Sequence, residues 1–371
     1  ISIAVSDKHS FSLTAFFIGF FIMKKELQPI IWEDAKLQLI DQRALPAKEI
    51  YITLEDAAGV ADAITKMVVR GAPAIGISAA YGVVLSYYHR QGNVELISQD
   101  FKTLEHSRPT AVNLHHALAR LKKVWFDELE SHGGAHGAFE AIGQRLLEEA
   151  KAIQAEDLEY NVAMAKHGIK SLKESTEKQT IKVMTHCNTG SLATGGLGTA
   201  LGIIKTAAHK GFVEHVYATE TRPWLQGSRL TAFELNYEGV PVQLLVEGGA
   251  AGLMASGEVD WLIVGADRIT ANGDVANKVG TFTLAVLAKQ FGVKVMVAAP
   301  STTVDMSLES GQQIPIEYRG SEEILKAAGY ADGFDMPVYN PAFDVTPAAF
   351  IDLIVTEQGA VKPAQLASLF A

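Results

Sequence analysis

The fold of this chain is decided by residues 181–219, which read IKVMTHCNTGSLATGGLGTALGIIKTAAHKGFVEHVYAT. The apolar runs at 181–185 and 213–219 have the length and the Val and Ile content of buried strands. Residues 195–209, between them, favour a helix. A strand, a helix and a second strand in this order predict a parallel sheet, whose ligands bind beyond the carboxyl ends of the strands.

The same alternation continues toward the C-terminus and predicts an α/β fold with helices on both faces of the sheet. Further strands are expected at 242–246, 261–264, 294–298 and 351–355, the last of the sheet, and further helices at 227–237, 248–256 and 281–291. The stretch 300–345, which contains four prolines, is predicted to be a long excursion over the surface.

The preceding part of the chain is predicted to be a mostly helical domain over residues 23–175, with the sheet domain at 176–371. Apolar residues recur at helical spacing from Leu54 to about Lys173, and two short strands are expected at 38–42 and 49–52. Residues 1–22 are interpreted as a non-native or disordered N-terminal extension, because MKKEL at 23–27 is typical of a translation start and no signal-peptide cleavage site follows the apolar run at 11–23.

Composition excludes several classes of function. The net charge of -10 argues against a nucleic-acid-binding surface, which needs an excess of Lys and Arg. The apolar run at 11–23 is too short to cross a bilayer as a helix, so no membrane partner is expected. A single cysteine, Cys187, rules out an intrachain disulfide and any multi-cysteine metal site, which fits a reducing compartment such as the cytoplasm.

Cys187 is a candidate reactive residue because of its position. A lone cysteine often only fills a core. This one directly follows a predicted strand, in a loop of Asn, Thr, Gly and Ser. We expect a helix to begin just after the loop, and its amino end would favour a thiolate.

Asp267 follows the predicted strand 261–264 and should emerge at the same edge of the sheet. A partly desolvated carboxyl group there can be protonated near neutral pH and act as an acid. The alternative is a carboxylate that only pairs with Arg268 or caps a turn.

Phosphate is the ligand favoured by three other segments. Lys278 and Asn277 precede Gly280 at the predicted start of the helix 281–291, where free N–H groups and the helix dipole attract an anion. Arg70 and Arg108 each stand just before a proline-containing helix start, and arginine can hold a phosphate with two parallel hydrogen bonds.

A dinucleotide site is a weaker alternative. Gly196, Gly198 and Gly202 resemble a glycine-rich loop, and Glu220 lies where a ribose-binding acid would be expected. The fingerprint requires glycines immediately after the strand, however, and here residues 187–195 intervene. We therefore expect Gly198 and Gly202 to lie inside the helix, close to the sheet.

Taken together, the segments resemble the methylthioribose-1-phosphate isomerases, a family related to the regulatory subunits of eukaryotic initiation factor 2B. The resemblance runs from about Met23 to the C-terminus. The matching strings are RGAPAIG (70–76), RPTAVNL (108–114), THCNTGSLAT (185–194), ETRPWLQGSRLTAFEL (220–235) and GADRITANGDVANKVGTFTLAVLA (265–288).

This resemblance implies an N-terminal mainly helical domain, a C-terminal Rossmann-like catalytic domain and a homodimer. It implies interconversion of 5-methylthioribose 1-phosphate and 5-methylthioribulose 1-phosphate in methionine salvage, without a metal or other cofactor. Asp267 would be the general acid and Cys187 would assist hydrogen transfer. The substrate would be bound by the following residues: Arg70, Gly71, Ala72, Arg108, Gln226, Asn277 and Lys278.

Two rivals share the same fold. One is an isomerase of ribose 1,5-bisphosphate or 5-deoxyribose 1-phosphate, for which Arg222, Arg229 and Arg268 could serve a second phosphate. The apolar Ile75, Trp224 and Leu225 favour the thioether sugar instead. The other rival is a non-catalytic regulatory subunit, which need not keep an acid and a thiol together.

Overall fold

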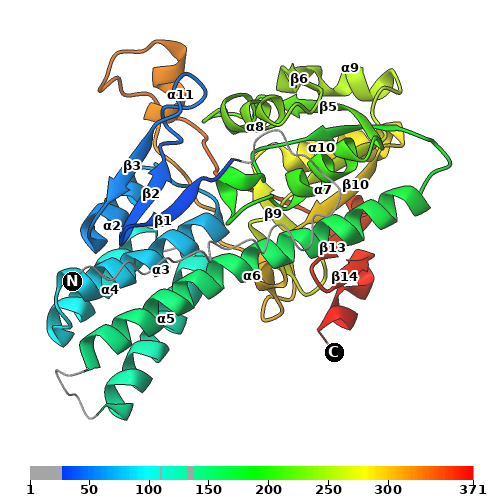
Figure 1. The fold of residues 1–371 in the computed structure, drawn as a ribbon. Helices are drawn as coiled ribbons and strands as arrows, with labels where there is room; N and C mark the ends of the chain where they lie inside the picture. The colour runs from blue at the N-terminus through cyan, green and yellow to red at the C-terminus, as the bar shows by residue number, and fades with distance from the viewer. Residues whose placement is uncertain (1–26, 109–110, 133–137, 371) are drawn as a thin grey trace.

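The computed structural model describes residues 27–108, 111–132 and 138–370. Figure 1 shows them as a helical part and a sheet part, with one long helix running along both. The predicted extension at 1–22 lies outside the described residues, as do Pro109 and Thr110. No helix in the described ranges has the length and apolar content needed to cross a bilayer.

The N-terminal part is mainly helical, as predicted, and carries one small antiparallel sheet. Its strands are β1 (Ile30–Glu33), β2 (Lys36–Ile40) and β3 (Tyr51–Leu54). Its helices are α2 (Ala57–Thr65), α3 (Ala72–His89), α4 (Val94–Ser107), α5 (Val112–Ser131) and α6 (Phe139–Glu174). Strands β2 and β3 confirm the two predicted strands with slightly shifted bounds, whereas β1 was not predicted.

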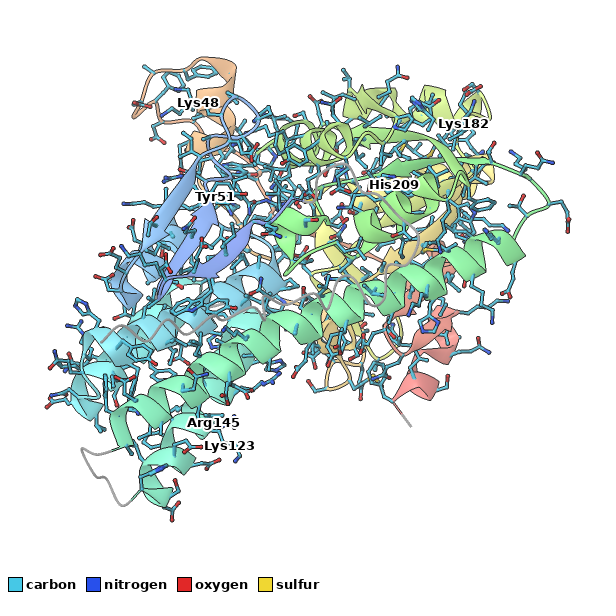
Figure 2. The ribbon with its side chains drawn as sticks, in the orientation of Figure 1. Lys48, Tyr51, Lys123, Arg145, Lys182 and His209 are labelled. Carbon is cyan, nitrogen blue, oxygen red and sulfur yellow. The ribbon has the colours of Figure 1, made fainter. Side chains whose placement is uncertain are left out.

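Helix α3 is the centre of this part. Every residue from Ala74 to Tyr87 is buried, because helices and the small sheet cover α3 on several sides. The surrounding helices are amphipathic and keep their charged residues outside. Lys123 pairs with Asp127 on α5 and Arg145 with Glu148 on α6, and Figure 2 shows Lys123 and Arg145 at the far end of these helices, away from the sheet.

The C-terminal part contains the predicted parallel sheet, with seven strands. From one edge to the other they are β14 (Gly359–Val361), β13 (Leu353–Thr356), β10 (Lys294–Ala298), β7 (Trp261–Val264), β4 (Ile181–Thr185), β5 (Val213–Thr219) and β6 (Val242–Leu245). All neighbours are parallel except β14, which pairs antiparallel with β13. The expectation that the segment at 351–355 is the last strand was wrong, because the chain turns back to form β14.

Helices cover both faces of this sheet. Alternation along β4 sends Val183 into a core shared with α6 and α7 (Ala200–His209), while Met184 faces a core shared with α9 (Ala250–Ala255) and α10 (Thr281–Phe291). Helix α8 (Ala232–Tyr237) continues a π-helical turn at Gly227–Thr231. Helix α6 ends just before the predicted domain boundary, but it packs on both parts of the chain (Figure 1).

A second, four-stranded sheet corrects the interpretation of the stretch 300–345. Its order is β11 (Val304–Asp305), β8 (Arg268–Thr270), β9 (Val275–Lys278) and β12 (Phe343–Thr346). The stretch therefore begins and ends in sheet pairings, and only its middle, around α11 (Glu322–Leu325), is an exposed excursion. The prolines marked irregular backbone correctly, but they did not indicate how much of it is buried.

The start of α7 also differs from the prediction. The helix begins at Ala200, so Gly202 lies inside it but Gly198 precedes it with φ +94°. A Cβ atom at Gly198 would lie 2.4 Å from the Cα of Gly190. Glycine is needed there for a close approach of two loop segments, and no helix begins directly after Cys187.

Candidate functional site

One cavity of about 650 Å³ lies at the carboxyl ends of the sheet strands, facing the amino end of α3. In folds built on a parallel sheet, ligands bind at this edge. Nine residues singled out from the sequence all line it: Arg70, Gly71, Ala72, Arg108, Cys187, Gln226, Asp267, Asn277 and Lys278. Segments more than a hundred residues apart in sequence are therefore brought together around one space.

Cys187 lies in the loop just after β4, two residues beyond Thr185, and is 8% exposed. Its backbone has φ +63°, a left-handed conformation that is uncommon for residues other than glycine. The Cys187 N–H donates to Thr221 Oγ1 at 2.9 Å, and the Cys187 carbonyl accepts from Thr231 Oγ1 at 2.6 Å. The loop is thus held on both sides of the thiol, by the segment after β5 and by the start of α8.

Asp267 follows β7 and opens onto the cavity. Its carboxyl group is accessible from the cavity but is otherwise surrounded by protein, and this burial raises the pKa of Asp267. The positive charges of Lys278, Arg70 and Arg108 oppose the rise. A carboxyl group in such surroundings can be held protonated near neutral pH, which is the requirement for a general acid.

Of the three cations, Lys278 opposes the rise in the pKa of Asp267 most strongly. Burial lowers the pKa of Lys278, while the negative forms of Cys187 and Asp267 raise it. Its Nζ donates to the Ala342 carbonyl at 2.6 Å and lies 4.4 Å from the centre of the Phe343 ring. The charge of Lys278 is therefore coupled to both the Cys187 thiol and the Asp267 carboxyl group.

The amino end of α10 is not the free anion site that the sequence indicated. The Asp344 carboxylate accepts from Gly280 N at 2.7 Å and from Phe282 N at 3.1 Å. Asn277 Nδ2 donates to Thr281 Oγ1 at 2.9 Å. Lys278 and Asn277 still line the cavity, but a side chain of the protein already occupies the helix end.

The open helix ends belong to α3 and α5. Among the residues that the structure describes, no side chain caps either amino end, and Gly71, Ala72 and Val112 line the cavity there. Arg70 and Arg108 stand just before these ends. Two uncapped helix ends with two adjacent guanidinium groups form an arrangement that favours an anion.

Arg70 is held in place by Asn188, which was not identified from the sequence. Arg70 Nη2 donates to Asn188 Oδ1 at 2.9 Å, and Asn188 Nδ2 donates to Glu234 Oε1 at 2.7 Å. Glu234 is completely buried beside Lys205 and also accepts from Ser191 N at 2.7 Å. The amide of Asn188 therefore has one orientation, with its oxygen toward Arg70.

Two buried polar atoms at the cavity have no hydrogen-bond partner among the described residues. They are Arg70 Nε, a donor, and Gln226 Oε1, an acceptor. Buried polar groups are rarely left unpaired, because the loss of a hydrogen bond to water is costly. A polar ligand that accepts at Arg70 and donates at Gln226 would satisfy both.

Other expectations from the sequence were only partly correct. Ile75 and Arg268 line the cavity, but the following do not: Arg222, Trp224, Leu225 and Arg229. Arg229 instead donates to the carbonyls of Gln42 and Arg43 and lies 4.2 Å from the centre of the Trp224 ring. It joins the N-terminal part to the site loop.

The stretch 314–319 forms a wall of the cavity that the sequence analysis missed. It contributes Ile314, Ile316, Glu317 and Arg319. Arg319 pairs with Glu323 on α11 and lies 3.9 Å from Glu317. Charged residues between prolines gave no signal that distinguishes a cavity wall from a surface loop.

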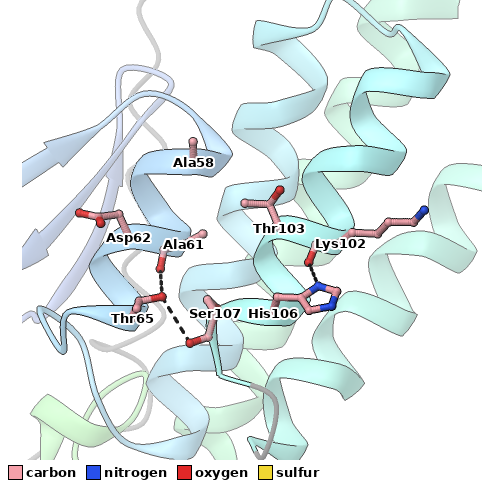
Figure 3. A pocket seen from close by; sticks show the side chains of 8 residues that line it. All are labelled: Ala58, Ala61, Asp62, Thr65, Lys102, Thr103, His106 and Ser107. Carbon is pink, nitrogen blue, oxygen red and sulfur yellow. Dashed lines mark hydrogen bonds between the residues drawn. The ribbon is translucent and has the colours of Figure 1, made fainter.

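A smaller hollow of about 450 Å³ lies between α2 and α4 (Figure 3). Its polar side chains bond to neighbouring carbonyl groups: Thr65 Oγ1 donates to Ala61 O at 2.8 Å, and His106 Nδ1 lies 2.6 Å from Lys102 O. It offers no convergent set of free polar atoms. Within the described ranges, no cluster of three or more His, Cys, Asp or Glu residues could hold a metal ion.

Comparison with known proteins agrees with this geometry. Residues 68–363 match the sequence profile of the initiation factor 2 subunit family. The methylthioribose-1-phosphate isomerase of Pseudomonas fluorescens (strain Pf0-1) is 52% identical over 342 residues, which cover 91% of this chain and 93% of that protein. This chain belongs to the methylthioribose-1-phosphate isomerase family, within the initiation factor 2 subunit family.

Solved structures support the fold assignment of this family member. The crystal structure of 5-methylthioribose 1-phosphate isomerase from Pyrococcus horikoshii OT3 is 39% identical, has a TM-score of 0.85, and the match covers 94% of this chain and 98% of that one. The structure described as translation initiation factor eIF-2B, subunit delta, from A. fulgidus is 36% identical with a TM-score of 0.80, and the match covers 92% and 97%. The predicted α/β class is confirmed.

Proposed function

We propose that this chain is an aldose–ketose isomerase that interconverts 5-methylthioribose 1-phosphate and 5-methylthioribulose 1-phosphate in methionine salvage. The observation that carries the proposal is the cavity at the carboxyl ends of the strands, where Cys187, Asp267 and Lys278 meet two uncapped helix ends and two arginines. Relatives about half identical over most of the chain bear this activity in their names.

The phosphate is assigned to the amino ends of α3 and α5. Arg70 and Arg108 supply charge, Gly71 and Ala72 lie at the uncapped end of α3, and the unpaired Nε of Arg70 is a donor still to be satisfied. Guanidinium groups hold phosphate oxygens with charge-assisted hydrogen bonds. The sugar then extends toward Gln226, whose unpaired oxygen can accept from a hydroxyl group.

Asp267 is assigned the opening of the sugar ring. A 1-phosphate locks the aldose as a ring, so the ring oxygen must be protonated before the C1–O bond of the ring can break. Burial, which raises the pKa of Asp267, keeps a proton available for this step. The carboxylate left behind is stabilised by the Lys278, Arg70 and Arg108 charges that oppose the rise.

Cys187 is assigned the hydrogen transfer from C2 to C1. A thiolate could take the C2 proton and return it to C1 through an enediol, and Lys278 would stabilise that thiolate. Alternatively, hydrogen moves as hydride and the buried thiol only shapes an apolar site. Both routes balance without an external oxidant or reductant, and both predict that alkylation of Cys187 stops turnover.

The cavity favours a thioether sugar over a bisphosphate. Apolar lining is supplied by Met67, Ile75, Ile314, Ile316 and Phe343. The remaining cations, Arg268 and Arg319, pair with Asp305 and Glu323. A second phosphate would lack an unpaired cation and would enter apolar surroundings at a high cost, whereas a buried methylthio group contributes about 1–3 kcal/mol.

The regulatory-subunit alternative rests on the likeness to the archaeal delta-subunit structure at 36% identity. Against it stands the presence of Asp267, Cys187 and Lys278 in one cavity, an arrangement that pure binding does not need. The homodimer, the absence of nucleic-acid and membrane partners, the absence of cofactors and the cytoplasmic location stay predictions from the sequence and its resemblance.

A substrate panel tests the proposal. The purified protein is assayed with 5-methylthioribose 1-phosphate, 5-deoxyribose 1-phosphate and ribose 1,5-bisphosphate, and kcat/KM is compared. We expect the methylthio sugar to exceed the bisphosphate by at least about a hundredfold. Equal values or a preference for the bisphosphate would place the chain with the rival isomerases, and no turnover of any sugar would favour the regulatory reading.

A further inference from the structure

His186 is a completely buried histidine that the proposed chemistry does not use. It follows β4 directly and precedes Cys187. Its Nε2 lies 2.9 Å from the Val279 carbonyl and its Nδ1 lies 2.7 Å from Thr219 Oγ1. Both ring nitrogens are therefore engaged by segments that border the cavity, one from β5 and one from the loop after β9.

These contacts determine the tautomer of the ring. A carbonyl oxygen only accepts, so Nε2 carries the proton and donates to Val279. Nδ1 is then an acceptor, and the Thr219 hydroxyl donates to it. Burial lowers the pKa of His186 to about 4, so the ring is neutral at ordinary pH.

The chain of hydrogen bonds continues from His186 to the backbone of Cys187. Thr221 Oγ1 lies 3.1 Å from Thr219 Oγ1 and 3.3 Å from the Thr219 carbonyl oxygen, and it can donate to either. Thr221 Oγ1 in turn accepts from Cys187 N at 2.9 Å. The two threonines thus link the backbone of Cys187 to the imidazole.

At its other end, the series of hydrogen bonds reaches the segment that carries Lys278. Val279 immediately follows Lys278, and Gly280 packs directly against the imidazole, since a Cβ there would lie 3.0 Å from His186 Cε1. The ring thus lies between the loop that carries the thiol and the loop that carries the ammonium group. The Cys187 loop has an unusual backbone conformation, with φ +63° at Cys187, that needs fixed partners to persist.

We propose that His186 is a positioning residue that ties the Cys187 loop to the Lys278 loop, through Thr219 and Thr221 on one side and Val279 on the other. It sets where the thiol stands relative to the ammonium group without touching the sugar. As a role in isomerisation this rests on the proposed function. Its effect on the thiol does not, because the thiol can be measured without substrate.

The test uses two variants that interrupt this series of hydrogen bonds at different points. His186→Gln keeps a donor for Val279 but has no acceptor at the position of Nδ1, where Thr219 donates. Thr219→Val removes the hydroxyl while nearly preserving shape. Thr185→Val is the matched control, because its buried hydroxyl, at the end of β4, donates to Ile263 O on β7 at 2.8 Å and does not join this series of hydrogen bonds. Folding is followed by circular dichroism and thermal unfolding of the whole protein.

Two readouts are measured for each variant: kcat and KM with the methylthio sugar, and the rate of Cys187 alkylation by iodoacetamide without substrate. We expect both test variants to lower kcat about 10- to 100-fold with KM changed less than about threefold, as for an effect on the reacting geometry alone. Alkylation should change at least threefold in both variants and stay at the wild-type rate in Thr185→Val.

Wild-type kcat and alkylation in a folded His186→Gln or Thr219→Val protein would overturn the proposal, and so would equal losses in the Thr185→Val control. If His186→Gln fails to fold, Thr219→Val decides alone. If the wild-type protein turns over none of the sugars, the proposed function fails, while the alkylation rates still decide the role of His186.

Discussion

Replacement of Asn188 by leucine should weaken the use of the substrate phosphate while leaving the fold in place. Asn188 is 4% exposed and joins Arg70 to Glu234 through bonds of 2.9 and 2.7 Å. Leucine has nearly the same size but removes both bonds. Arg70 Nη2 then keeps only its longer contact with the Asn188 backbone carbonyl, at 3.3 Å.

The magnitude follows from the charge on Arg70. A hydrogen bond to a charged group contributes about 1.5–3 kcal/mol, which corresponds to about a 10- to 150-fold change in an equilibrium or rate ratio. We therefore expect Asn188→Leu to lower kcat/KM for the methylthio sugar by about 10- to 150-fold. The free energy of unfolding should fall by about 1–3 kcal/mol, because Glu234 loses a buried donor.

Steady-state kinetics and thermal unfolding of the same preparations measure both effects. Asn161→Leu is the control: Asn161 is equally buried and donates to Asp157 and Gly196, neither of which lines the cavity. It should lose stability but keep kcat/KM within about threefold. If Asn188→Leu is folded and as active as the wild type, Arg70 is not the phosphate ligand that this account requires.

Three further outcomes are expected. Asp267→Asn should lower kcat about 10²- to 10⁴-fold, with substrate binding retained because an amide still forms hydrogen bonds; activity within tenfold of wild type would reject Asp267 as the acid. Lys278→Met removes the charge that most opposes the raised pKa of Asp267, so the acid stays protonated to higher pH and the alkaline fall in kcat/KM should move upward; a downward shift would contradict this. Gly227→Ala should lower the free energy of unfolding by more than about 4 kcal/mol, because its Cβ would lie 1.7 Å from Thr219 O. The control Gly252→Ala, whose Cβ would meet no atom within 4 Å, should be tolerated. Similar stability of the two variants would refute the packing argument.

The sequence predicted the large sheet well because its strands are short apolar runs between clear helices. The bounds of β4, β5, β7 and β10 agree with the predicted segments. The four-stranded sheet escaped prediction because β8 and β9 carry Arg268, Asn277 and Lys278 and are only three or four residues long. Polar residues that serve a cavity interrupt the alternation by which a strand is recognised.

The candidate site was predicted as a set of residues but not as a set of contacts. Cys187 and Asp267 follow predicted strands, and that position alone places them at one edge of the sheet. Asn188 has no such signal, since its partner Arg70 is 118 residues away. Asp344 caps α10 but lies more than 60 residues away in the sequence, so no local pattern could show that the helix end was occupied.

The central claim is that this chain catalyses an isomerisation at Asp267 and Cys187, and ³¹P NMR of the reaction tests it most directly. Purified protein is mixed with 5-methylthioribose 1-phosphate, and Asp267→Asn and iodoacetamide-treated protein serve as controls. The account predicts that the signal of the sugar 1-phosphate is replaced by that of the ketose 1-phosphate with the untreated protein only. An unchanged spectrum with the untreated protein, or equal conversion by the controls, would contradict it.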